Sequence, residues 1–187
     1  MKTREKTKSK KLLILLLCLC ICGCEFAINP GAGNPGTGSP GPGNPGAGNP
    51  GPGNPVTTDP AVAEKQNEIT ALVNTERSKA GLAGLSANNA LMEAAMIRAK
   101  ELASSFSHTR PDGKICFTVL AEKGIHYSAA GENIAAGYTT SQAVMNGWMN
   151  SEGHRNNILN KNFTRLGVGY YVQNGYAYWV QLFTDGN

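Results

Sequence analysis

A proline- and glycine-rich repeat divides this chain of 187 residues into parts that cannot share one fold. From Asn29 to Pro55 a five-residue unit, N-P-G-x-G, repeats with proline at every fifth position. A collagen triple helix needs glycine at every third residue, so a period of five excludes it. The segment has no aliphatic or aromatic side chain larger than alanine, so burial cannot offset the entropy of ordering it. We expect a disordered tether within residues 24–58 and a folded domain over residues 59–187.

The N-terminus has the pattern of an export signal. A basic stretch, Lys2–Lys11, precedes an apolar stretch, Leu12–Ile21, which is about half the ~20 residues that a membrane-spanning helix needs. We therefore expect residues 1–23 to be a signal peptide. Residues 1–11 hold six of the 17 Lys and Arg residues and one of the 13 acids, which leaves 11 basic against 12 acidic residues. The remainder is nearly neutral, and its charge gives no reason to expect nucleic acid as a partner.

Four of the five cysteines lie in or beside the signal. Residues 19–24 end in Gly23-Cys24 and resemble a bacterial lipobox, with Cys24 as the lipidated residue; ordinary cleavage and free secretion is the alternative. We expect an exported protein at the cell surface or outside the cell, anchored in the membrane through Cys24. Only Cys116 lies beyond the tether, so the domain has no internal disulfide available and depends on its apolar core. A buried, inert Cys116 is the simplest expectation, because a catalytic thiol would need an adjacent base.

The folded part contains helix, turn and strand signals that together predict an α+β fold. The Asx cap at Asp59 and the C-capping Gly81 predict one helix, and a second begins at Asn88 or Asn89. A capping box of Thr139 and Gln142 opens a further helix, which we expect to stop at Gly153. Asn174-Gly175 is a strong type I′ turn signal between two alternating stretches. The expected elements are helices at 60–80, 88–102 and 117–123, a short strand at 131–135, a helix at 139–153, and a hairpin of strands 165–173 and 176–183.

Polar residues at three segment boundaries form the candidate site. His108 and His154 each follow an expected helix, and Glu132 lies in the expected short strand, with Glu152 close to His154. Two imidazoles and a carboxylate can hold a divalent ion such as zinc, with water completing its coordination. Without metal, the same groups can form a polar cleft in which Glu132 raises the pKa of a histidine. The sequence lacks H-E-x-x-H, paired zinc-type cysteines, a Walker loop and G-x-S-x-G, so no complete catalytic motif decides between these alternatives.

Five blocks of this sequence resemble a known family. They are Phe106-Ser107-His108, Gly131-Glu132-Asn133-Ile134-Ala135, the stretch W-M-N-S-E-G-H-R-N-N-I-L at 148–159, Gly167-Val168-Gly169-Tyr170 and Tyr178-Trp179-Val180-Gln181. In this order they are similar to the bacterial SCP-like extracellular domains of the CAP superfamily. That superfamily includes cysteine-rich secretory proteins, antigen 5 and plant pathogenesis-related proteins. The resemblance covers about residues 62–183 and implies an α-β-α sandwich with a central antiparallel sheet, a C-terminal β-hairpin and a wide surface cleft.

The resemblance also assigns site residues. The family's cleft carries two histidines and two acids, and some members bind zinc or another divalent ion there. His108 and His154 match the histidines and Glu132 matches the acid of the G-E-N block. Glu152 falls near the place of the second acid, in a loop that is shorter in this chain. The expected metal ligands are therefore His108, Glu132, His154 and Glu152, and the first three are also the expected ligand-binding residues.

The family has no single agreed activity, so function has to be inferred from the site. Our first hypothesis is a surface-anchored binding module that engages an extracellular ligand (a lipid, a wall fragment or a peptide), with no catalytic residue assigned. The alternative is a metal-assisted hydrolase of peptide or cell-wall bonds, in which Glu132 or His154 moves protons. A third interpretation is structural, with Glu132 and His154 satisfying only one another.

Overall fold

The fold has been obtained as a computed structural model that describes residues 27–28 and 59–186. The expected signal peptide, the lipidation site Cys24 and the proline-glycine repeat lie outside the described residues. The helices are α1 (Pro60–Lys79), α2 (Asn89–Leu102), α3 (Thr118–Glu122), α4 (Ser141–Asn150) and α5 (Glu152–Ile158). The strands are β1 (Ala27–Ile28), β2 (Ser86–Ala87), β3 (Ala129–Ala136), β4 (Arg165–Gln173) and β5 (Tyr176–Thr184).

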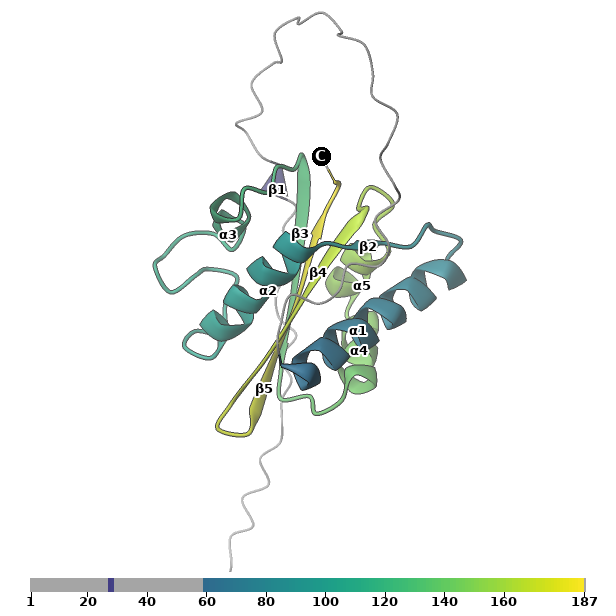
Figure 1. Cartoon of the computed structure of the whole chain (residues 1–187). Coiled ribbons are helices and arrows are strands. Elements are labelled where there is room, and N and C mark those ends of the chain that lie inside the picture. Colours follow the sequence, from purple (N-terminus) through teal and green to yellow (C-terminus); the bar gives the residue numbers. More distant parts are fainter. Residues whose placement is uncertain (1–26, 29–58, 187) are drawn as a thin grey trace, which may run out of the picture.

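The strands form one sheet between two helical layers (Figure 1). The strand order is β1-β3-β5-β4-β2, and the β1–β3, β3–β5 and β5–β4 pairs are antiparallel. The short β2 runs parallel to β4, and the two-residue β1 lies just before the proline-glycine repeat. Helices α2 and α3 cover one face, and α1, α4 and α5 cover the other. This arrangement confirms the α+β class, the α-β-α layering and the C-terminal hairpin.

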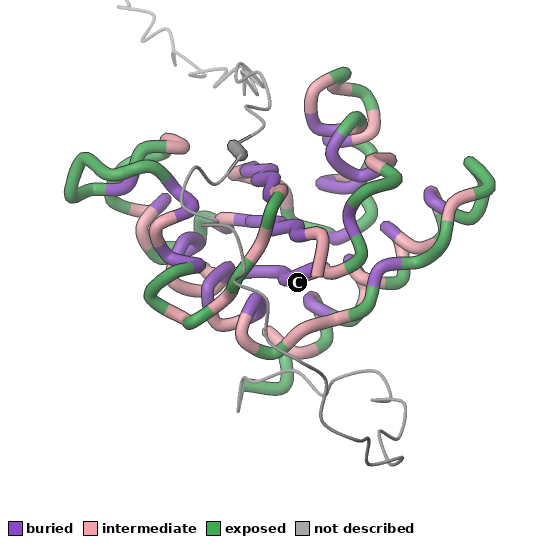
Figure 2. Tube along the Cα trace, turned by 90° about the horizontal axis from the view of Figure 1, so that it is seen from above, coloured by how far each residue is buried: buried purple, intermediate pink, exposed green. Residues whose placement is uncertain are grey.

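Each face of the sheet has its own apolar core. Figure 2 shows the buried residues along the sheet and on the helix faces turned toward it. On the α1, α4 and α5 side the core is built around Trp148, Trp179 and Phe163, all essentially inaccessible to solvent. On the α2 and α3 side it is built around Leu91, Leu120 and neighbouring alanines. Both tryptophans thus contribute to the core rather than to a ligand-binding surface.

Two glycines of β4 allow α2 to lie directly on the sheet. A Cβ atom at Gly167 would lie 2.3 Å from the carbonyl oxygen of Leu91, and one at Gly169 would lie 2.1 Å from that of Ala95. The approach is so close that the β4 amide of Val168 donates to the Met92 sulfur at 3.0 Å. Helix α2 is therefore fixed against β4, and it carries Arg98 into the site described below.

Arg77 of α1 fixes the chain that follows α5. This residue is 1% exposed, and its guanidinium donates to the carbonyl oxygens of Ile158 and Asn160, both at 2.8 Å, and to that of Phe163 at 3.4 Å. A fourth bond reaches Ala83 at 2.8 Å. The chain after α5 has no helix or sheet to donate to these carbonyl oxygens, so the buried arginine supplies their hydrogen bonds instead.

The helix expected over 139–153 was placed wrongly in two respects. Its N-cap is Thr140, whose side chain accepts from the Ala143 amide, rather than Thr139. It ends at Asn150, because Ser151 is extended (φ −98°, ψ 123°) and starts the separate helix α5. His154 therefore lies inside α5 rather than beyond the end of a helix. Among the described helices, none is both long enough and apolar enough to cross a membrane.

Candidate metal centre

His108 lies on the segment between α2 and α3, with its ring held against β3. The imidazole Nδ1 is 2.7 Å from Glu132 Oε1, and the backbone carbonyl of His108 accepts from the Cys116 amide at 2.9 Å. Because Nδ1 meets a carboxylate, the tautomer with hydrogen on Nδ1 leaves a lone pair on Nε2. The Nε2 atom is buried and has no hydrogen-bond partner among the described residues.

The Glu132 carboxylate is fully enclosed and already paired. Arg98 Nε donates to Oε2 at 2.8 Å and Arg98 Nη2 to Oε1 at 3.3 Å, and both side chains are buried. Alternation along β3 turns Glu132 toward α2, which supplies Arg98, and turns the next residue, Asn133, toward α5. A buried carboxylate is tolerated here because a guanidinium and an imidazole surround it.

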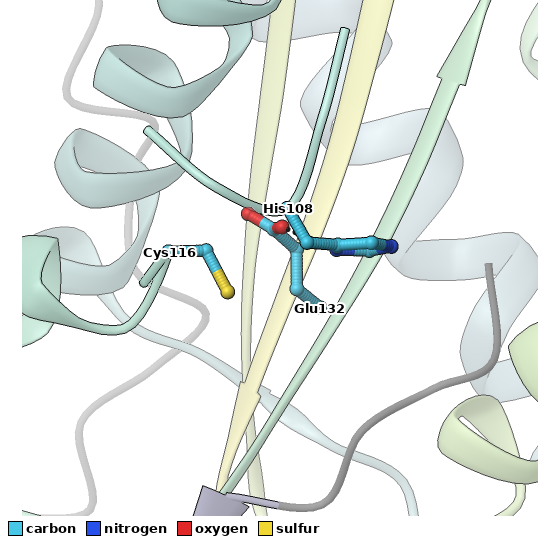
Figure 3. A group of neighbouring side chains, drawn as sticks. All are labelled: His108, Cys116 and Glu132. Carbon is cyan, nitrogen blue, oxygen red and sulfur yellow. Dashed lines mark hydrogen bonds and ion pairs between the residues drawn. The ribbon is translucent and has the colours of Figure 1, made fainter. Parts of the chain in front are cut away.

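Cys116 completes a compact group with these two residues. One ligand atom from each of His108, Cys116 and Glu132 lies within 4.8 Å of the others. In Figure 3 the Glu132 carboxylate lies between the Cys116 thiol and the His108 ring, which extends away from Cys116. Burial, and then the Glu132 charge, raise the pKa of the Cys116 thiol far above its usual range. The thiol is therefore protonated in the metal-free protein, which agrees with a buried, inert cysteine.

His154 reaches the same region from the opposite helical layer. Its side chain is 2% exposed, and neither ring nitrogen has a hydrogen-bond partner among the described residues. Burial, and to a smaller extent the neighbouring His108, lower the pKa of His154 to about 4. His154 is therefore neutral near pH 7, which is the state that ligates metal.

Helix α5 is attached to β3 by amide side chains, and this attachment places His154. Asn133 Nδ2 donates to the His154 carbonyl at 3.1 Å, and Asn157 Nδ2 donates to the Glu132 carbonyl at 3.3 Å. A Cβ atom at Gly131 would lie 3.0 Å from the Asn157 side chain, so glycine leaves room for this contact. The G-E-N block thus has three separate tasks: space for Asn157, a carboxylate for His108, and an amide for α5.

The sequence did not reveal every residue of the site. Arg98 and Asn157 were not among the expected residues, and Cys116 was expected only to be buried. A signal for Arg98 exists, because it falls in the apolar stripe of α2 between Ala95 and Leu102, where a charge needs a buried partner. Glu152 is exposed at the first position of α5 and is not in the converging group, so its role in the site stays a prediction.

The donors present offer a metal ion two alternative sets of ligands. The first uses the converging His108, Cys116 and Glu132 atoms, but a cation there would lie beside the buried Arg98 charge and compete with it for Glu132. The second would use the unpartnered Nε2 of His108 with a ring nitrogen of His154, a neighbour close enough for His108 to lower its pKa. Glu132 would then orient His108 from behind, as carboxylates do for many metal-bound histidines. Buried nitrogens with no partner are costly, which favours the second arrangement.

The burial of His154 predicts that the metal-free protein loses stability in acid. The unfolded chain binds a proton near the ordinary pKa of 6.5, whereas folded His154 does so only near pH 4. Between these values the unfolded state holds more protons, so stability falls as pH falls, by up to about 3 kcal/mol. Denaturant unfolding in EDTA from pH 7 to pH 4 measures this loss. Carboxylates also titrate in this range, so His154→Gln, which lacks the imidazole, gives their contribution for subtraction. Equal slopes in both proteins would contradict the burial of an unpaired imidazole.

Comparison with known proteins identifies the domain. The sequence profile of the cysteine-rich secretory protein family, CAP, matches residues 70–183. The chain belongs to the CAP family. The resemblance read from the five sequence blocks is therefore confirmed, together with the α-β-α layering and the C-terminal hairpin that it implied.

Relatives of this CAP domain include bacterial proteins of greater length. The Bacillus subtilis protein YkwD is 41% identical over 140 residues, which cover 66% of this chain and 54% of YkwD. An extracellular protein containing an SCP domain from Bacillus anthracis is 33% identical, with a TM-score of 0.63 over 70% of this chain and 44% of that one. The chain thus spans about half the length of these relatives.

A more distant likeness shows the fold alone. The structure of NaASP2 with Zn²⁺ is 16% identical, with a TM-score of 0.51 over 69% of this chain and 84% of that one.

Proposed function

We propose that this CAP protein is an exported binding module in which His108 and His154 hold a divalent metal ion, zinc being the best fit. The observation that carries the proposal is the set of buried ring nitrogens without partners: His108 Nε2 and both nitrogens of His154. Imidazole suits zinc, copper and nickel better than the hard cations magnesium and calcium. A bound ion would offer its remaining coordination positions to an extracellular ligand such as a lipid, a wall fragment or a peptide.

The location outside the membrane belongs to the same proposal. Residues 1–24 have the pattern of an export signal that ends in a lipidated Cys24, and the proline-glycine repeat would separate the anchor from the domain. The similar protein from Bacillus anthracis is described as extracellular. A free Cys116 in a domain without a disulfide is compatible with export, because the thiol is buried.

The site favours binding over hydrolysis. A metal-bound water needs a base within reach to take its proton. Both Glu132 oxygens accept hydrogen bonds from Arg98, and one also meets His108, so this carboxylate is committed to positioning. The metal-assisted hydrolase remains the alternative, and it would require a base other than Glu132.

Zinc titration tests the proposal. The suitable protein lacks residues 1–24, which removes four thiols and keeps every residue that the structure describes. Zinc should raise its unfolding temperature through preferential binding to the folded state. His108→Ala and His154→Ala should each weaken zinc binding by at least about 100-fold, since losing a ligand costs more than losing its support.

The third histidine supplies the matched control. His126 is exposed in the segment before β3, so His126→Ala should bind zinc as the parent protein does. Calorimetry measures all three variants under the same conditions. If the parent protein does not bind zinc, or if His126→Ala loses as much affinity as the other two, the proposed metal site is wrong.

A further inference from the structure

The segment that carries His108 has little apolar contact to hold it in place. It covers residues 103–117, between α2 and α3, and two of its large apolar side chains, Phe106 and Ile115, are 49% and 60% exposed. Packing therefore anchors this segment mainly at its end, where Cys116 and Phe117 are buried. The position of the His108 ring must depend on polar contacts.

Arg110 supplies the strongest of these contacts. Its side chain is 8% exposed, and its guanidinium bonds two carboxylates on two different helices. Toward α2, Nε and Nη2 donate to Glu101 Oε1 at 3.0 and 2.7 Å. Toward α3, Nη1 and Nη2 donate to Glu122, and Nη1 also donates to Thr118 Oγ1 at 2.9 Å. The segment is thereby held to the helix before it and the helix after it.

The same contacts continue into the site. Glu101 also accepts from Arg98 Nη1 at 2.7 Å, and Arg98 in turn donates to Glu132, the partner of His108. Burial alone would raise the pKa of Glu101, but hydrogen bonds from Arg110 and Arg98 outweigh it and lower that pKa. Glu101 is thus ionised and paired on both sides. The result is an unbroken series of alternating charges from Glu122 to Glu132, the carboxylate that holds His108.

We infer that Arg110 is a positioning residue of the metal site, which fixes the 103–117 segment and thereby holds the His108 ring in its place against Glu132. The inference rests on the proposed function, because its readout is metal affinity. Arg110 touches neither the histidines nor the proposed ion, and it acts through the segment and through Glu101. Arginine is required here because one planar guanidinium bonds two carboxylates at once, whereas the single ammonium of lysine cannot reproduce both pairs.

Arg110→Lys tests the inference, since it keeps the positive charge but loses the simultaneous hydrogen bonds to Glu101 and Glu122. We expect zinc affinity to fall at least ~10-fold, as for other residues that orient metal ligands. Glu122→Gln weakens only the α3 side of the contact, whose carboxylate is half exposed, and should have a smaller effect. Glu122→Gln also keeps the test usable if Arg110→Lys folds poorly: a smaller but measurable loss of affinity supports the inference, and no loss overturns it.

A destabilised control separates positioning from general stability. Gln66 is a buried residue of α1 outside the Arg110 contacts, and it donates to the Val168 carbonyl at 2.8 Å. Gln66→Ala should lower the unfolding temperature by a few degrees and leave zinc affinity unchanged. Calorimetry and thermal unfolding of the metal-free variants give both quantities. If Arg110→Lys and Gln66→Ala lose affinity in proportion to their stability, Arg110 is merely structural and the inference is overturned.

The outcomes also separate this inference from the proposed function. A parent protein that fails to bind zinc removes both. A parent protein that binds zinc, with Arg110→Lys binding it equally well, overturns the role of Arg110 and leaves the site of His108 and His154 intact.

Discussion

Replacing Glu132 with alanine is expected to lower the free energy of unfolding by about 3–5 kcal/mol. The substitution leaves the Arg98 guanidinium, whose side chain is fully buried, without its main partner, and it also frees His108 Nδ1. Glu101 remains beside Arg98 but is itself shared with Arg110. A buried charge that loses its partner costs more than the pair ever contributed. Denaturant unfolding monitored by tryptophan fluorescence measures the loss.

A double variant distinguishes this cause from loss of volume. Arg98→Met together with Glu132→Ala removes the unpaired charge and should recover a large part of the lost stability. If Glu132→Ala alone costs less than about 1 kcal/mol, the carboxylate is not the counterion that the contacts indicate. The same result would weaken its assigned role in orienting His108.

Replacing Gly169 with alanine is the second large expected effect, at about 3 kcal/mol or more. The added Cβ would meet the Ala95 carbonyl oxygen at 2.1 Å, and a backbone atom inside α2 cannot rotate away as a side chain can. Helix α2 would have to move off β4, and Arg98 would move with it. Zinc affinity should therefore fall along with stability.

Gly84→Ala is the matched control for this prediction. A Cβ at Gly84 would meet only the Asn74 side chain, at 3.3 Å, which needs to shift by a few tenths of an ångström. We expect the two alanine variants to differ by at least about 2 kcal/mol in the free energy of unfolding. If Gly169→Ala and Gly84→Ala lower the free energy of unfolding equally, α2 does not lie in direct contact with β4 at Gly169.

Local signals in the sequence predicted much of the fold. The Asp59 side chain caps α1 as expected, accepting from the Ala61 amide at 2.9 Å. Helix α2 begins where it was expected, with the Asn88 side chain accepting from the Leu91 amide at 3.0 Å. Asn174 and Gly175 both have positive φ, as a type I′ turn requires. These features need only neighbouring residues, and for that reason composition and spacing revealed them.

Features set by packing between distant segments were not predicted. The break at Ser151 separates α4 from α5 without a side-chain cap, so no local signal marks it. The two-residue strands β1 and β2 exist only through their pairing with β3 and β4. Likewise, spacing alone could not bring His108 to Glu132, 24 residues away; the family resemblance supplied that pair. Arg98 joins them only because α2 packs on the sheet.

X-ray absorption at the zinc edge, on the zinc-loaded protein without residues 1–24, is the most direct test of the central claim. We predict nitrogen and oxygen neighbours at ~2.0–2.1 Å and no sulfur neighbour, because His108 and His154 hold the ion while Cys116 stays behind Glu132. The spectrum of Cys116→Ser should be the same. A sulfur shell at ~2.3 Å that disappears in Cys116→Ser would contradict the account and place the metal in the His108, Cys116 and Glu132 group instead.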